Sequence, residues 1–246
     1  MKHPVDIVPT CLGAHLVPKS YQKNRDKFLA MVCNELLPFV KKNKLSRICD
    51  VFCDNEAFTV EEARKILNAA KSLGFACKLH ADQLSYSGGA ELASELGCLS
   101  ADHLDFVSFE AMSKMALANV VGVMIPSAHI FLGKKQVAPA RDLRRAGVKL
   151  AVSTDCNPGT SHTANLPLAM TLAATELKMT CDEIWLGVTR YASKALGLLN
   201  CGVIEQGKNA DFCVWDTLDY RDIPYQFGSA QPIQVIKNGK IVHIVN

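Results

Sequence analysis

Histidine and aspartate residues stand where short apolar segments of the sequence end. Each segment reads as a buried strand, and the polar residues that close four of them are His15, His80, His103 and Asp155. Imidazole nitrogens and carboxylate oxygens bind divalent transition metals, and both groups relay protons. Residues of these types at four separate strand ends favour a common polar centre over four unrelated positions.

Two of these residues also have ordinary structural interpretations. His15, taken alone, could be a hydrogen-bonded histidine at a junction between a strand and a loop. Asp155 could be a turn residue, because aspartate side chains bond their own backbone ahead of a sequence such as Pro158-Gly159. The recurrence of the same ligand class at distant positions is what favours a shared site.

The elements that must position these residues follow a repeating pattern. A short apolar strand followed by an amphipathic helix recurs along the first two-thirds of the chain, which is typical of parallel βα units. Because the carboxyl ends of parallel strands open onto one face, polar residues placed there converge in space. We predict six such units, with strand ends near His15, Phe52, His80, His103, Pro126 and Asp155.

Helix signals support this pattern. Residues 60–73 form a predicted helix, with Thr59 as its N-cap, Glu62 three residues on and Gly74 at its end. Two longer helices are predicted after the last strand, over residues 166–177 and 181–196.

The pattern of predicted secondary structure changes near residue 201. Residues 202–216 and 233–243 read as short strands, with Asn238-Gly239 as a tight hairpin turn. We therefore expect a main domain over residues 1–200 and a small β-structured part over residues 201–246.

Composition excludes several classes of partner. The 27 basic and 24 acidic residues nearly balance without a Lys/Arg block, which argues against nucleic acid. The longest apolar run, residues 120–126, is far too short to span a membrane.

Ten cysteines without a Cys-x-x-Cys pair, including Cys77 and Cys213 in apolar runs, are typical of buried thiols in a reducing compartment. A cytoplasmic protein is the resulting expectation.

Several motifs resemble those of imidazolonepropionases, a family of the metal-dependent amidohydrolase superfamily. The motifs are KLHADQLS (residues 78–85), LSADHL (99–104) and STDCNPGTS (153–161), and the likeness extends along essentially the whole chain. The resemblance implies an α/β fold, a (β/α)8 TIM-type barrel missing about its first two strands, with a small β domain at the C-terminus. It also implies one zinc or iron ion and hydrolysis of 4-imidazolone-5-propanoate to N-formimidoyl-L-glutamate in histidine degradation.

Carried over position by position, the resemblance implies a role for each site residue. His80 and Asp155 are the implied metal ligands. Asp155 would also accept and return protons, and His103 would help to polarise the carbonyl or move protons. The implied substrate-binding residues are His15, Gln83, Asn157, Gly159 and Thr160.

The sequence also departs from the family pattern. A His-x-His pair, which the family supplies from its first barrel strand, is absent from the 246 residues. Two ligands instead of four would hold the ion weakly, and an unclosed barrel exposes strand edges. We therefore expect a truncated chain that acts only with the missing segment, with a complementing chain or through self-association, for which a homodimer is the simplest form.

Three functions stay open on the sequence alone. The first is imidazolonepropionase-like hydrolysis, inactive in the truncated form. The second is another cyclic amide hydrolase or deaminase of the superfamily, acting on guanine or cytosine. A loop suited to a propionate tail, carrying Asn157, Gly159 and Thr160, disfavours this second function. The third is a non-catalytic subunit.

Overall fold

The computed structural model describes residues 3–244, and the chain divides into two compact units. The site unit comprises residues 8–123 and 142–149. The C-terminal unit comprises residues 124–141 and 150–244, together with residues 3–7. The predicted limit between residues 200 and 201 stays a prediction.

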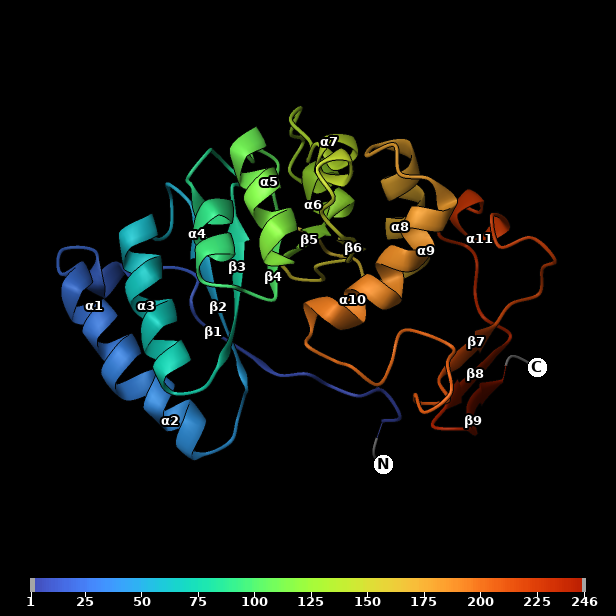
Figure 1. Ribbon diagram of the computed structural model, residues 1–246, viewed down its shortest axis with the longest axis horizontal. Coiled ribbons are helices and arrows are strands. Elements are labelled where there is room, and N and C mark those ends of the chain that lie inside the picture. The colour runs from blue at the N-terminus through green and yellow to red at the C-terminus, as the bar shows by residue number, and fades with distance from the viewer. Residues whose placement is uncertain (1–2, 245–246) are drawn as a thin grey trace. The chain divides into compact units, whose positions relative to one another are not determined.

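A parallel sheet forms the centre of the site unit (Figure 1). Its strands lie side by side in chain order, as the repeating βα pattern predicts. The strands are β1 (Thr10–Ala14), β2 (Ile48–Cys53), β3 (Ala76–Ala81), β4 (Ser100–His103) and β5 (Val121–Met124). The predicted strand ends near His15, Phe52, His80 and His103 are therefore confirmed.

Helices follow the strands of the site unit. Between β1 and β2 the chain forms η1 (Lys19–Tyr21), α1 (Arg25–Met31), η2 (Val32–Leu36) and α2 (Leu37–Lys42). The later helices are α3 (Val60–Ser72), α4 (Gly89–Glu95), α5 (Phe109–Ala118) and α7 (Ala140–Arg145), which crosses the division between the units. Alternation of strand and helix confirms the predicted α/β class.

Side chains on the two faces of strand β3 have different neighbours. The Cys77 thiol donates to the Leu67 carbonyl oxygen of α3 at 3.8 Å, and Gly89 of α4 packs against Leu79 and Ala81. The odd-numbered side chains of β3 therefore face the helices. Because side chains alternate along a strand, Lys78 and His80 point to the opposite face of the sheet.

Helix α3 begins with the predicted cap. The Thr59 hydroxyl oxygen accepts from the Glu62 backbone N–H at 3.2 Å, and the Thr59 N–H donates to the Glu62 carboxylate at 2.9 Å. The helix ends at Ser72 with Leu73 as its C-cap, and Gly74 directly after the cap has a φ of +76°, which a glycine adopts without steric cost. Both helix signals in the sequence are thus confirmed.

Loss of this cap has a measurable cost. Thr59→Ala is expected to lower the free energy of unfolding by about 1 kcal/mol, because the Glu62 N–H loses its acceptor. Urea unfolding followed by circular dichroism measures the change, with Lys65→Ala on an exposed position of the same helix as the control. Equal stability of the two variants would contradict the capping role.

The C-terminal unit combines helices with a small sheet. Its helices are α6 (Pro126–Phe131), α8 (Leu166–Thr175), α9 (Cys181–Val188), α10 (Arg190–Ala195) and α11 (Asp222–Tyr225), and it also contains β6 (Leu150–Val152). An antiparallel sheet contains β7 (Phe212–Val214), β8 (Gln234–Lys237) and β9 (Lys240–Ile244). The hairpin turn at Asn238-Gly239 is confirmed, and both residues have the positive φ that such a turn requires.

Four details of this unit correct the sequence predictions. The helix predicted over residues 181–196 is two helices, because Thr189 leaves helical geometry with φ −123° and ψ −90°. Strand β6 ends at Val152, not at Asp155, whose positive φ of 48° is incompatible with a strand. Of residues 202–216, only 212–214 form a strand. Cys213, predicted to be buried, is exposed, because its strand lies at the edge of the small sheet.

Within residues 3–244, every helix is too short or too polar to cross a membrane.

Candidate metal centre

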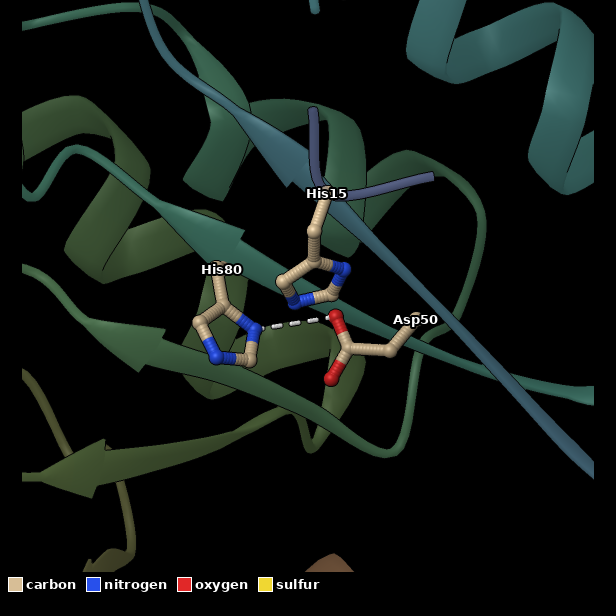
Figure 2. Close-up of side chains that lie close together, drawn as sticks. All are labelled: His15, Asp50 and His80. Carbon is tan, nitrogen blue, oxygen red and sulfur yellow. Dashed lines mark hydrogen bonds and ion pairs between the residues drawn. The ribbon is translucent and has the colours of Figure 1, made fainter. Parts of the chain in front are cut away.

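Three side chains of the site unit point toward one another (Figure 2). They are His15, directly after β1, Asp50 in the middle of β2, and His80 near the end of β3. One nitrogen or oxygen atom from each lies within 4.8 Å of the corresponding atoms of the other two. The neighbouring strands therefore bring two imidazoles and a carboxylate to one place.

The three predicted histidines of this unit also lie close together. The ring centroids of His15 and His80 are 4.7 Å apart, and those of His80 and His103 are 5.2 Å apart. His103 has a positive φ of 76°, which turns its side chain out of the regular alternation of β4. The expectation that distant strand ends converge thus holds for these histidines.

Asp50 and His80 form a buried pair. The His80 Nδ1 lies 3.0 Å from the Asp50 Oδ1, and Asp50 is 2% exposed. Burial by itself raises the pKa of Asp50, but the charge and hydrogen bond of His80 outweigh it and lower that pKa below its ordinary value. Burial lowers the pKa of His80, and the Asp50 carboxylate outweighs this and raises it. Without a bound metal ion, the pair therefore favours a negative Asp50 beside a positive His80.

His15 has different electrostatics. Both ring nitrogens are buried without a hydrogen bond of ordinary geometry among the described residues. Burial and then the nearby charge of His80 lower the pKa of His15 to about 4. Its imidazole is therefore neutral at neutral pH, which is the form that binds a metal ion. Because buried polar atoms without partners are costly, this ring is suited to receive a ligand.

A second charged pair lies on the same face of the sheet. Lys78 Nζ lies 2.9 Å from Asp102 Oδ2, and the Ser100 hydroxyl donates to Asp102 Oδ1 at 2.6 Å. Lys78 stands opposite Asp50 on one side and Ser100 on the other, while His80 stands opposite Asp102. We call Asp50, Lys78, His80, Ser100 and Asp102 the polar layer.

Gln83, a predicted substrate-binding residue, lies in the loop after β3. It is 6% exposed, and its backbone N–H donates to Asp54 Oδ2 at 3.0 Å. The same carboxylate accepts from the Leu84 N–H at 2.8 Å and from the Ser85 hydroxyl at 2.7 Å. Asp54, at the end of β2, therefore fixes the loop that carries Gln83.

The remaining predicted site residues lie together in a loop of the C-terminal unit. The Asn157 side-chain amide donates to Asp155 Oδ2 at 3.1 Å and to the Thr160 hydroxyl at 2.9 Å. The Asn157 Oδ1 accepts from the backbone N–H groups of Gly159 at 2.9 Å and Thr160 at 2.8 Å. Asp155, Asn157, Gly159 and Thr160 thus form one hydrogen-bonded loop around a strained aspartate backbone.

Sequence reasoning missed Asp50 and Asp54 as parts of the site. A signal for Asp50 was present, since it is a carboxylate in the middle of the apolar segment Ile48–Cys53. Charged residues are rarely buried unless they are paired, so such a position predicts a partner on a neighbouring strand. Lys78 and Asp102 carry the same signal.

The donor set of the cluster fits a transition metal. Zinc and iron are bound by imidazole nitrogen and carboxylate oxygen, the groups that His15, Asp50 and His80 present. The neutral ring of His15 needs no deprotonation, and the acidic Asp50 is ionised at neutral pH.

Comparison with known proteins confirms the resemblance of the motifs. The chain is 43% identical to the imidazolonepropionase of Bacillus velezensis over 98% of its length, and 42% identical to that of Myxococcus xanthus over 97%. It spans 57% and 56% of those relatives.

Solved structures share the fold. A triazine hydrolase from Arthobacter aurescens matches 96% of this chain and 60% of its own with a TM-score of 0.70 at 16% identity. An adenosine deaminase from Xanthomonas campestris with bound zinc matches 94% of this chain and 60% of its own with a TM-score of 0.65 at 20% identity.

Residues 12–242 match the sequence pattern of the amidohydrolase family. The match begins within β1, runs through both units and ends within β9. The chain belongs to the amidohydrolase family.

Proposed function

We propose that this chain supplies the centre of a metal-dependent hydrolase that opens the ring amide of 4-imidazolone-5-propanoate to give N-formimidoyl-L-glutamate. The observation that carries the proposal is the cluster of His15, Asp50 and His80, in which neighbouring strands place the proposed ligand His80 beside a buried carboxylate and a second, neutral imidazole. The identity of 43% to an imidazolonepropionase along 98% of the chain supports the choice of substrate.

The predicted metal-binding and catalytic residues have distinct proposed roles in this reaction. One zinc or iron ion, when bound, acts as a Lewis acid and lowers the pKa of water. His80 and Asp155 are the proposed protein ligands. The Asp155 carboxylate accepts a proton from the attacking water and returns it to the departing ring nitrogen, and His103 polarises the ring carbonyl through a hydrogen bond.

Substrate binding is proposed for the other residues. The neutral imidazole of His15 and the amide of Gln83 hold the ring, since both groups donate and accept hydrogen bonds. The loop after Asp155 holds the carboxylate of the propionate tail through its remaining members: Asn157, Gly159 and Thr160.

Hydrolysis of the substrate is measured with the purified chain alone and with a complementing chain that supplies a His-x-His pair. Loss of imidazolone absorbance and formation of N-formimidoyl-L-glutamate are expected in the complemented sample, with guanine, adenine and cytosine as control substrates. Deamination of a base without ring opening of the imidazolone would contradict the proposal and favour a deaminase.

Metal content and oligomeric state are measured in the same preparation. The expectation that the 246-residue chain needs complementing ligands stays a prediction, as do the homodimer and the cytoplasmic location. A monomer with stoichiometric zinc or iron and full turnover would contradict the need for complementation.

Gln83→Ala is expected to raise KM about tenfold with kcat little changed, because one hydrogen bond to the substrate is lost in ground and transition states alike. The bonds from Asp54 to the loop use the Gln83 backbone, so the loop is retained. Steady-state kinetics measures the effect, with the exposed Gln206→Ala as control. A fall in kcat at constant KM would contradict a substrate-binding role.

A further inference from the structure

We propose that Asp50 is a positioning residue, which holds the His80 imidazole through Nδ1 so that Nε2 carries the lone pair toward the metal ion. The inference rests on the proposed function, since it concerns the same site. Asp50 Oδ1 lies 3.0 Å from His80 Nδ1, and its side chain is buried. A carboxylate at one ring nitrogen fixes the tautomer and the ring plane of a ligating histidine.

The close-up view shows this orientation. In Figure 2 the Nδ1 of His80 faces the Asp50 carboxylate, and the other ring nitrogen of His80 points away from it. A ring that donates its Nδ1–H to Asp50 has only Nε2 to offer to a metal ion. His15 lies beside the pair with its ring edge-on to His80 at 4.7 Å, which limits rotation of the His80 ring.

The sheet makes this contact rigid. Strands β2 and β3 pair in unbroken register from Ile48 with Ala76 to Cys53 with Ala81. Asp50 stands opposite Lys78, and His80 lies two residues further along the same face, so the hydrogen bond runs diagonally between neighbouring strands. Groups built on paired strands are held more firmly than groups on loops.

Neighbouring charges keep Asp50 ionised as an acceptor. Lys78 stands opposite Asp50 in the register of β2 and β3, and its ammonium donates to Asp102, which also accepts from Ser100. Asp50 thus lies beside two residues of β3 whose positive charges favour its negative form, His80 at 3.0 Å and Lys78 opposite it in the strand register. The alternative role for Asp50, direct ligation of the metal ion, predicts a different response to substitution.

The first test is nuclear magnetic resonance of the full metal-free chain labelled with 15N-histidine. Wild type is expected to show a downfield, slowly exchanging proton on His80 Nδ1, assigned by its loss in His80→Gln. That proton is present whether His80 is neutral or charged. Asp50→Asn keeps an oxygen acceptor of the same size, so the proton is expected to persist with a shifted frequency. Absence of the proton in wild type, or an unchanged signal in Asp50→Asn, overturns the proposal.

The second test is zinc titration of the same variants by calorimetry. Asp50→Asn is expected to weaken zinc binding about 10- to 100-fold, and His80→Gln to abolish it. Asp102→Asn is the matched control, because this equally buried carboxylate of the polar layer bonds Lys78 and Ser100, and its effect is expected to be smaller. Circular dichroism checks that each variant is folded.

The outcomes of the two tests separate the positioning role of Asp50 from the proposed hydrolase function. Wild-type affinity in Asp50→Asn overturns the positioning role, and a loss as complete as in His80→Gln overturns it in favour of direct ligation. A wild-type chain that shows the Nδ1 proton but binds no zinc, either alone or with a complementing chain that supplies a His-x-His pair, supports the orientation of His80 by Asp50, while the proposed hydrolase function fails.

Discussion

Asp155→Asn is expected to lower kcat for imidazolone hydrolysis by about 10²- to 10⁴-fold in any preparation that carries the activity. An amide cannot accept the proton that the proposed reaction releases, and this is the usual size of a lost general base. The fold is expected to survive, because an asparagine oxygen can still accept the bond that Asn157 donates at 3.1 Å.

Steady-state kinetics and thermal unfolding of the same samples measure both parts of this prediction. Asp216→Asn, an exposed aspartate of the same unit, is the control and is expected to behave as wild type. Turnover close to that of wild type in Asp155→Asn would show that another group moves the proton.

Lys78→Met is expected to lower the free energy of unfolding by about 3–5 kcal/mol, because it leaves the Asp102 carboxylate buried without its cation. The exposed fractions of the two side chains are 14% and 6%, so water does little to replace the lost partner. Urea unfolding monitored by circular dichroism measures the change.

A double variant provides the matched control. Lys78→Met with Asp102→Leu removes both charges, and replacement of a buried ion pair by apolar residues is often close to neutral. The double variant is therefore expected to regain most of the lost stability. If it were no more stable than Lys78→Met alone, the unpaired charge would not be the cause of the loss.

Local signals made much of the site unit predictable. The apolar run before His80, the cap at Thr59 and the stop at Gly74 are each encoded within a few residues, and each is found where the sequence places it. The alternation of strands and helices predicts parallel strands that lie side by side in chain order. The proximity of His15 and His80 was therefore predictable as well.

Features that depend on the register of paired strands or on backbone dihedral angles could not be predicted from such local signals. The bond from Asp50 to His80 requires the exact pairing of β2 with β3, which residue types alone do not specify. Strand β6 ends at Val152, and Asp155 lies in the loop that follows with a positive φ that its residue type alone does not specify. Exposure of Cys213 depends on its place at a sheet edge.

The tight contact of Gly89 with β3 limits how the sequence can vary beside the site. A methyl group at this position would come within 2.9 Å of the Ala81 side chain and 3.2 Å of its Cα, closer than neighbouring atoms allow without movement. Helix α4 would have to withdraw from β3, and the segment that joins them, which includes Gln83, would be pulled with it. The absence of a side chain at Gly89 thus sets how closely α4 packs on β3, and with it the position of the loop that carries Gln83, the proposed substrate-binding residue.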